Sequence, residues 1–411
     1  MLPIVQKAFI SLYVTLLAFM VMAGIAAGIA FVTVGEVRAL GASSRSRQAY
    51  ATAEAGIEDA VYRIRKGLAI PAGYTLAVGS AATEVSVATD GVTRTIVSRG
   101  DYRGANRALE ARLSFAVDGA EFFYGVQVGE GGLDMGENTV ITGNVFSNGD
   151  IKGAGKTKST ITGTAQAAGD HLIKDIAVNA GATAARFDNC AIAGTASYVA
   201  SFTNCTASST RVIGAAPPAE AFPISQSQID EFKNQALAGG TLAGYTLGSN
   251  TSGTLGPKKI EGNITLGNNT TLTLTGTLWV TGTVNFGNTD IIQLDSGYGP
   301  TSGVLVVDGS VDIGNSATLT GSGQEGSYLV LVSLFGPGDA IDIGNSAAGA
   351  IFYAPNGIID VGNGLDLKEA TGYGLKVGNN ASITYETGLA NLQFSSGPGA
   401  GFNVLQWREV E

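Results

Sequence analysis

One short motif recurs seven times along the chain: two apolar residues with a polar residue between them, then Gly, then Asn or Glu. The later copies are spaced 20, 27, 30, 18 and 16 residues apart. This spacing is too irregular for a strict solenoid, but it fits coils of about twenty residues that carry variable loops. We therefore predict an irregular right-handed β-solenoid as the main body of a mainly β protein. The motif glycines are Gly136, Gly267, Gly287, Gly314, Gly344, Gly362 and Gly378.

The motif is most simply a stacking device. Each coil is expected to turn at the motif glycine, because Gly takes positive φ without steric cost. The Asn that follows tolerates the left-handed region and can hydrogen-bond to its counterpart one coil away. Successive coils pair like strands about 4.8 Å apart, so identical residues stack. The predicted stacking residues are Gly267, Asn268, Gly287, Asn288, Gly314, Asn315, Gly344, Asn345, Gly362, Asn363, Gly378 and Asn379.

A sharper interpretation concerns Asp312, Asp342 and Asp360, each two residues before a motif glycine. Alternation places them on the solvent face, where a row of like charges repels unless an ion intervenes. They are the candidate site for a cation or a sugar. With one histidine and two cysteines in the whole chain, a multi-ligand zinc site has almost nothing to be built from. We predict no metal and no cofactor.

The two cysteines occupy the same place in two related segments, FDNC from Phe187 and FTNC from Phe202. If these segments lie in adjacent coils, the Cα atoms of Cys190 and Cys205 are about 5 Å apart, within disulfide range. An exported protein can oxidise such a pair. The alternative is a pair of buried free thiols within the stack, and the sequence does not choose between the two.

The repeats are interrupted between Ala216 and Gly240 by a segment whose prolines precede a Ser-capped stretch. Its apolar residues recur at helical spacing, which predicts a linker and a short helix between two parts of one solenoid. At the C-terminus we expect a last strand that covers an open end of the solenoid, since solenoids need capping. The helix residues are Ile229, Phe232, Ala236 and Leu237, and the capping residues are Phe402, Val404, Leu405 and Trp407.

At the N-terminus, the 26 residues from Phe9 to Val34 carry no charge. As a helix they rise about 39 Å, enough to cross a hydrocarbon core of roughly 30 Å. A cleavable secretory signal is the competing interpretation, because AGIA offers small residues for cleavage. Against it, the apolar run exceeds the usual signal core and the helical pattern continues beyond it.

This pattern continues as an apolar stripe and stops at Gly67, which is followed by Pro71. We predict one long helix from about Phe9 to Lys66, membrane-embedded in its first half and amphipathic in its second. Long C-terminal domains translocate largely regardless of flanking charge, so the N-terminus is expected on the cytoplasmic side. The stripe comprises Tyr50, Ala53, Ile57, Ala60, Val61 and Ile64.

Two segments carry a resemblance to a known family. QKAFISLYVTLLAF resembles a type IV prepilin leader junction with its hydrophobic helix, and AYATAEAGIEDAVYRIRKG is similar to the segment that follows in PilX-type minor pilins. The resemblance covers residues 6–67 and implies cleavage by prepilin peptidase between Ala8 and Phe9. The family usually has Gly where Ala8 stands, and major pilins have Glu where Tyr13 stands. Some minor pilins also lack that Glu. Its absence therefore argues against a bulk filament subunit rather than against the family.

Other function classes fit less well. A net charge of −10 argues against binding nucleic acid through its phosphates. β-Solenoids also host polysaccharide-degrading enzymes, but the carboxylates here form no recognisable pair and no GxSxG motif accompanies His171, so we predict no enzyme. A cytoskeletal polymer of the bactofilin type would normally lack a long N-terminal membrane span. The carboxylates considered are Asp290, Asp295, Asp308 and Asp339.

The predicted function is that of a membrane-anchored, pilin-like surface protein: a minor pilin or pilus-assembly component with a rigid head for structural or adhesive contacts. It is expected in the cytoplasmic membrane as a single-pass protein with its C-terminal domain outside the cytoplasm, at the cell surface or in a pilus. Its expected partners are the membrane, other pilin-like subunits, and glycans or other surfaces. A polysaccharide-binding or polysaccharide-degrading surface protein is the alternative. The expected segments are a leader (1–8), the helix (9–67), a small β-unit (68–118), a first solenoid part (119–215), the linker and short helix (216–240), and a second solenoid part with its cap (241–411).

Overall fold

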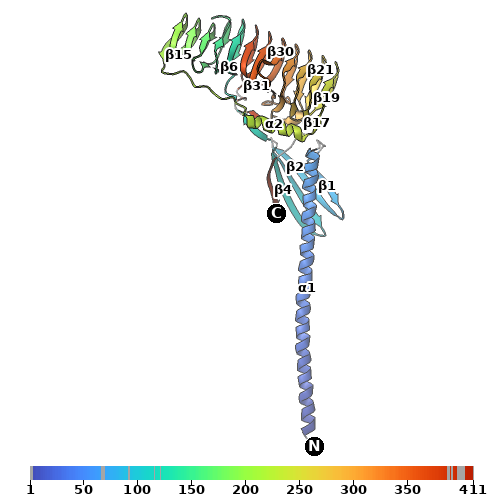
Figure 1. The fold of residues 1–411 in the computed structure, drawn as a ribbon. Coiled ribbons are helices and arrows are strands. Elements are labelled where there is room, and N and C mark those ends of the chain that lie inside the picture. Colours follow the sequence, from blue (N-terminus) through green and yellow to red (C-terminus); the bar gives the residue numbers. More distant parts are fainter. Residues whose placement is uncertain are drawn as a thin grey trace.

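The computed structural model of the 411-residue chain describes residues 3–65, 70–90, 93–114, 116–120, 122–386, 389, 392–395 and 403–410. It consists of a long N-terminal helix, a small antiparallel sheet, and a large parallel sheet wound into stacked coils with one short helix inserted (Figure 1). The predicted mainly β fold class is confirmed. The stacked coils form a head that lies across the end of the long helix (Figure 1).

Helix α1 (Pro3–Arg65) is one unbroken element of 63 residues. It is exposed from Leu12 to Arg45, whereas its C-terminal turns bury one stripe of side chains. The buried stripe comprises Ala49, Ala53, Ile57, Ala60 and Ile64, which steps of three and four residues keep on one helix face. Tyr50 was wrongly assigned to it, because it lies one residue away from Ala49 and is exposed. The predicted end of the helix at Lys66 and Gly67 lies outside the described residues.

The C-terminal part of α1 packs on a five-stranded antiparallel sheet. In spatial order its strands are β1 (Gly73–Val78), β2 (Ala81–Asp90), β3 (Thr93–Tyr102), β4 (Ala105–Ser114) and β35 (Asn403–Val410). Gly100 on β3 permits a close approach of the helix, because an added Cβ would lie 2.3 Å from the carbonyl oxygen of Ala49. Helix and sheet share an apolar core around Ile57, Ile96 and Leu109.

The predicted C-terminal cap of the solenoid is wrong. β35 instead extends the small sheet, where it pairs antiparallel with β4 and places Trp407 opposite Ala111. Val404 also belongs to this pairing, Leu405 lies at an irregularity in the register, and Phe402 lies outside the described residues. An apolar strand can pair with any open sheet edge. The chain leaves the solenoid beside the place where it entered, so the edge within reach is that of β4.

The chain enters the solenoid in the middle of its length, at β6, and winds toward one end (Figure 1). Coils of this first run stack in parallel and stop at β16, whose only strand partner among the described residues is β15. The strands of the first run are β6 (Val126–Met135), β7 (Thr139–Thr142), β8 (Val145–Ser147), β9 (Ile151–Lys152), β10 (Ser159–Ile161), β11 (Ala165–Ala167), β12 (Leu172–Lys174), β13 (Ala177–Val178), β14 (Ala182–Asp188), β15 (Ala191–Thr203) and β16 (Thr206–Val212).

A linker and helix α2 (Gln226–Ala238) then carry the chain along the outside toward the opposite end (Figure 1). The helix begins with a capping box in which Ser225 and Gln228 accept each other's backbone N–H. The predicted short helical insertion is confirmed. Three of its four predicted apolar residues are buried, namely Ile229, Phe232 and Ala236, whereas Leu237 is exposed.

The second run winds from that far end back to the middle, where β32 pairs with β6 and β33 pairs with β7. This seam joins the two runs into one continuous solenoid whose chain enters and leaves at mid-length. There β5 (Ala116–Ala120) and β34 (Leu392–Ser395) form a two-stranded neck. The elements of the second run are β17 (Thr241–Leu242), β18 (Tyr245–Leu247), β19 (Ser252–Leu255), β20 (Lys258–Ile260), β21 (Ile264–Leu266), β22 (Thr271–Leu274), β23 (Leu278–Val280), β24 (Val284–Phe286), β25 (Ile291–Leu294), the 3₁₀ turn η1 (Ser296–Tyr298), β26 (Gly303–Val307), β27 (Val311–Ile313), β28 (Thr318–Thr320), β29 (Leu329–Ser333), β30 (Asp339–Ile343), β31 (Ala348–Val361), β32 (Asp366–Val377) and β33 (Ser382–Thr384).

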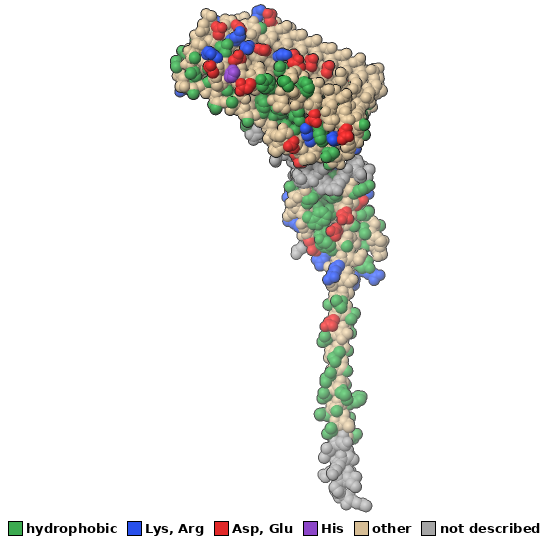
Figure 2. All heavy atoms as spheres, viewed as in Figure 1, with side chains coloured by type: hydrophobic (Ala, Val, Ile, Leu, Met, Phe, Trp, Pro, Cys, Tyr) green, Lys and Arg blue, Asp and Glu red, His purple; other side chains and the backbone are tan. Residues whose placement is uncertain are grey.

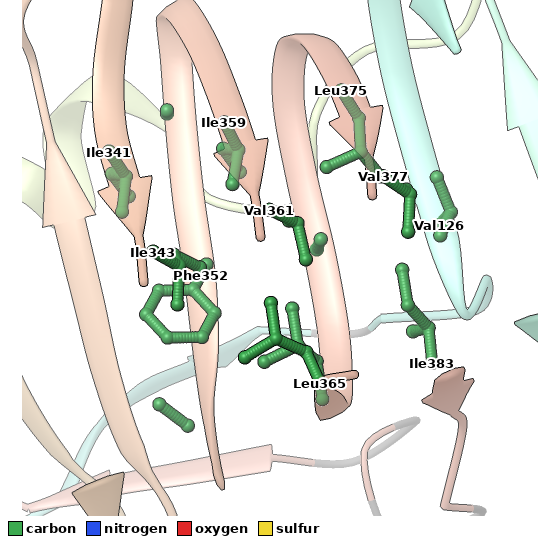
Figure 3. Packing of buried hydrophobic residues seen from close by; sticks show 14 of the residues in the cluster. Val126, Ile341, Ile343, Phe352, Ile359, Val361, Leu365, Leu375, Val377 and Ile383 are labelled. Atoms are coloured by element: carbon green, nitrogen blue, oxygen red, sulfur yellow. The ribbon is translucent and has the colours of Figure 1, made fainter. Parts of the chain in front are cut away.

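Two apolar clusters hold the head together. The larger fills the interior of the coils, and Figure 3 shows it at the seam, where Leu375 and Val377 of β32 and Val126 of β6 contribute to it. The smaller lies outside the coils, between one face of the solenoid, including Val332 and Tyr353, and a cover made of α2, the linker and the neck. Phe232 of α2 and Phe394 of the neck meet there edge to face, with ring centroids 5.1 Å apart.

Candidate functional site

The apolar half of α1 is a free surface in this chain. Its large side chains are mostly exposed, for example Phe19 at 72% and Phe31 at 84% (Figure 2). Within the described residues, one helix is long and apolar enough to cross a membrane; its most apolar window has a mean hydropathy of 2.3 and none of it is buried. A continuous apolar surface of this kind needs lipid or other apolar helices around it. The candidate cleavage residues Ala8 and Phe9 lie within α1, but their side chains are outside the described part.

The motif glycines form a column along the solenoid, each against the backbone of the neighbouring coil. A Cβ on Gly287 would lie 2.4 Å from the carbonyl oxygen of Gly267, and one on Gly314 would lie 2.5 Å from the carbonyl carbon of Gly287. The prediction that the motif glycines turn the chain with positive φ is wrong, because none of them has positive φ. Glycine is required at these positions because two coils approach too closely for a side chain.

The turn is made two residues after each motif glycine. The residues there have φ between 57° and 59° at Asn138, Asn269, Thr289, Ser316, Ser346 and Asn380, and φ 68° at Gly364. Their backbone N–H groups reach across to the neighbouring coil, as from Thr289 to the Asn315 carbonyl at 2.9 Å. This interstrand bond supports a left-handed conformation that residues such as Thr and Ser seldom adopt. The motif therefore uses Gly for the close contact between coils, Asn for a side-chain hydrogen bond to the neighbouring coil, and the residue after Asn for the turn.

The motif asparagines form a continuous hydrogen-bonded ladder, called here the asparagine ladder. In each rung, the Oδ1 of one Asn accepts the backbone N–H of the Asn in the neighbouring coil. The rungs join Asn288 to Asn268 (2.9 Å), Asn315 to Asn288 (2.8 Å), Asn345 to Asn315 (2.9 Å), Asn363 to Asn345 (2.7 Å) and Asn379 to Asn363 (2.8 Å). Asn379 in turn accepts the N–H of Glu137 at 2.7 Å. The ladder thus crosses the seam and links both runs.

The structure also brings the three aspartates of the candidate row together. Asp312 is in register with Asp342, and Asp342 with Asp360, on three successive coils. Lys376 ends the row, with its Nζ 3.3 Å from a carboxylate oxygen of Asp360 and 3.1 Å from one of Asp339. Partial burial and then the neighbouring carboxylates raise the pKa of Asp342. Negative charge is therefore crowded in the row and ion-paired only at one end.

A shallow groove of about 400 Å³ runs between this row and the asparagine ladder. Its walls carry Asn285, Asp312 and Asp342 on one side and Asn268, Asn288 and Asn315 on the other, with motif glycines between them. We call it the polar groove. It presents amide and carboxylate groups, which suit hydroxyl groups or cations. In the described part of the chain, no three His, Cys, Asp or Glu side chains are grouped to hold a metal ion.

The carboxylates weighed as catalytic groups have structural partners. Asp290 is fully buried and accepts the N–H groups of Thr270 and Gly287, both at 2.7 Å. Asp295 caps the 3₁₀ turn η1 by accepting the N–H of Gly297. These two groups therefore fix turns of the second run.

Asp308 belongs to the contact between α2 and the solenoid, where Lys233 of α2 pairs with it at 2.7 Å. Its other oxygen accepts the indole N–H of Trp279 at 2.9 Å. His171 lies on the first run instead, with Nδ1 3.1 Å from a carboxylate oxygen of Asp150. His171 and Asp308 therefore belong to different runs of the solenoid.

Cys190 and Cys205 lie in adjacent coils, because Phe187 and Phe202 just before them are in register. Both are free thiols, and the backbone N–H of Cys190 lies 3.1 Å from the Sγ of Cys205. Burial, and then the neighbouring Cys205, raise the pKa of the Cys190 thiol. The two sulfur atoms therefore lie close together in adjacent coils, with Cys190 buried and Cys205 half-buried, and a disulfide between them stays a prediction.

Sequence reasoning missed Glu369, which is fully buried and in register with Ile351 of the smaller apolar cluster. One carboxyl oxygen accepts the hydroxyl of Thr371 at 2.5 Å, and the other, Oε2, has no partner. Burial raises the pKa of Glu369 well above its usual range. Nothing in the surrounding LDLKEATGYG distinguishes this Glu from a surface residue, because the cover that buries it comes from distant segments.

No protein-family model and no curated protein matches the chain. Among solved structures, it is similar to the competence-associated pilin ComZ from Thermus thermophilus, at 13% sequence identity and a TM-score of 0.25, over 89% of this chain and 98% of that chain. At this identity and TM-score, no function can be transferred from that protein.

Proposed function

We propose that this chain is a membrane-anchored, pilin-like surface protein of a bacterium, a minor pilin or pilus-assembly component. In this proposal α1 crosses the cytoplasmic membrane once, with its N-terminus inside and the solenoid outside. The observation that carries the proposal is the exposed apolar half of α1, which no described segment covers. The same helix continues without a break into the stripe that packs on the small sheet. The membrane anchor and the stalk, as we call the C-terminal part of α1 with the small sheet, therefore share one continuous helix.

The same apolar half provides a surface for other pilin-like helices. Gly24 and Gly28 stand four residues apart on it, and a Cβ at either position would meet nothing in this chain. Small residues at such spacing allow helices to approach closely in a membrane. Lateral contacts of this type would hold the protein in or beside a pilus.

In this proposal the head is a rigid spacer or an adhesive surface rather than an enzyme. The structural use of Asp290, Asp295 and Asp308 supports a non-catalytic role. The asparagine ladder, which runs across the seam, supports rigidity along the solenoid. As partners of the head we propose surface glycans, or host or abiotic surfaces.

A second candidate function, binding of a polysaccharide chain, is favoured by the polar groove. A sugar chain lying along the solenoid axis would meet amide and carboxylate groups on successive coils, which suit its hydroxyl groups. Asp342→Asn should weaken retention of the protein on its host's purified surface polysaccharide, and Asp366→Asn, outside the groove, is the matched control. Equal retention of both variants and the wild type would exclude the groove as the binding surface.

The test of the anchor is the intact mass and N-terminal sequence of the protein recovered from its host membrane. We expect a mature chain that begins at Phe9, because the resemblance to prepilins places the cleavage before this residue. A chain beginning near Phe31 would show an ordinary secretory signal and would overturn the pilin proposal. A chain beginning at Met1 would leave a single-span anchor and would remove the pilin component of the proposal.

A further inference from the structure

The interior of the solenoid is open at both ends. The partly buried apolar side chains that pack on the larger cluster all lie toward the two ends of the stack: Tyr198, Phe202, Cys205 and Ala207 at the β16 end, and Tyr245 and Leu247 at the β17 end. Between the ends, each coil is covered by a coil on either side. Tyr198 has Val212 of β16 in register beside it. The other five residues are half-exposed because the stack lacks a further coil at each end.

The strands of the terminal coils also lack partners on their outer side. β16 pairs only with β15, and β17, β18 and β19 pair only with β20, β21 and β22 within the described residues. Such edges expose unpaired N–H and C=O groups, and proteins usually protect them with charges, proline or a covering segment. Here β17, β18 and β19 contain no charged residue and no proline, and the one charge of β16 is Arg211. The C-terminal strand, which the sequence predicted to cover an end, belongs to the small sheet.

We propose that the two ends bind each other between copies of this chain. The β16 end of one copy stacks on the β17 end of the next, and the parallel ladder continues across the interface. The two ends are the opposite edges of one parallel stack, so each offers the backbone groups that complement the other. Two identical ends cannot meet in this way, because they would face each other with the same edge. The interface is therefore head-to-tail, and repetition produces a linear row of heads.

The seam within the chain supports this mode of contact. There, β32 and β33 stack on β6 and β7 although no short connection links these two coils. The asparagine ladder ends in the terminal coil at Ser249, which takes the Asn position and whose hydroxyl accepts the N–H of Asn268 at 3.1 Å. A further coil stacked on this end would extend the ladder by one rung. The solenoid axis runs across the direction of α1 (Figure 1), so copies stacked end to end keep their stalks side by side.

The test is sedimentation velocity of the purified full chain in detergent micelles over a wide range of protein concentration. One charged variant is made at each end, Ala207→Lys and Leu247→Lys, because both side chains face the open interior. Matched controls place the same charge on the solvent side of the same strands, at Thr206→Lys and Thr246→Lys, which are exposed. Circular dichroism checks that all four variants retain the fold.

We expect the wild type and both control variants to form a concentration-dependent series of oligomers, and each end variant alone to stay monomeric. A mixture of Ala207→Lys and Leu247→Lys should form dimers and nothing larger, because each supplies the intact end that the other lacks. A monomeric wild type would overturn the proposal. Association that persists in both end variants would place the contact elsewhere, such as α1, and would also overturn it. The proposal does not depend on the membrane anchor, whose own test is the N-terminal sequence.

Discussion

Replacing Glu369 with Gln should make the protein more stable at neutral pH and leave its stability unchanged in acid. Gln has nearly the same shape and keeps an oxygen to accept the Thr371 hydroxyl, but it cannot ionise. In the wild type, burial raises the pKa of Glu369 well above its usual range because Oε2 has no partner. The unfolded chain therefore releases this proton at a lower pH than the folded chain does.

The sign of the effect follows from this difference. A raised folded pKa means that the contribution of Glu369 to stability is fully present below the unfolded pKa, near 4.3, and is lost as the pH rises toward the folded pKa. Within that window each pH unit costs the wild type about 1.4 kcal/mol. Glu369→Gln lacks this loss. Its stability advantage should be absent at about pH 4 and grow at this slope above it.

The measurement is urea unfolding of the full chain in detergent at a series of pH values, followed by Trp279 fluorescence in a Trp407→Phe background. Trp279 packs against the cluster that contains Glu369's neighbours, so it reports on the relevant part of the head. The matched control is Glu386→Gln, because the pKa of Glu386 is lowered by its bonds to Lys368 and Tyr328. This control should lose less than about 1 kcal/mol at neutral pH, with the difference vanishing in acid. Parallel stability curves for wild type and Glu369→Gln from acid to neutral pH would refute the reasoning.

The other predictions concern the coil contact, the thiols and the anchor. Gly314→Ala should destabilise the head by about 1–3 kcal/mol in urea unfolding, because its Cβ would meet the backbone of Gly287. The control Gly248→Ala, at the equivalent place in the terminal coil with nothing within 4 Å, should be neutral. Equal effects of the two substitutions would contradict the close-approach argument. Since burial raises the pKa of the Cys190 thiol, N-ethylmaleimide should label Cys205 first in the native protein and both thiols after unfolding. A chain that takes no label until it is reduced would show a disulfide. Ile25→Arg should reduce the fraction of the protein that stays in the membrane during carbonate extraction, since an Arg at the centre of a spanning helix raises the free energy of insertion by about 3 kcal/mol. Ser44→Arg should leave that fraction unchanged. An unchanged fraction for Ile25→Arg would argue against a membrane span.

The repeat predicted the local architecture well because stacking is a local matter. Alternation in VDIGNS and its relatives fixes which side chains enter the core, and a row of identical residues follows from parallel register. The roles inside the motif were harder to assign. Gly tolerates both positive φ and close backbone approach, and the sequence does not show which of the two a position requires. Only the distance from Gly287 to the next coil decides it.

The path of the chain could not be predicted, because coil-to-coil contacts are alike wherever they occur. Leu375 stacks on Leu133 in the same manner as Ile341 stacks on Val311, so nothing in either motif marks the seam. The place of the C-terminal strand depends on that path. The burial of Glu369 depends on it too, since α2 and the neck reach this face only because the chain returns along the outside.

The seam has a consequence for the order of folding. Within a run, paired residues of adjacent coils are close in sequence, as Val311 and Ile341 are, which lie 30 residues apart. Across the seam, Leu133 pairs with Leu375, which lies 242 residues later in the chain. Closing longer loops costs more entropy, so each run should form separately and the seam should close last. A chain emerging from its N-terminus presents the bare edge of β6 until nearly the whole head has been made. The middle of the finished solenoid is therefore the joint most open to mispairing while the protein is being synthesised.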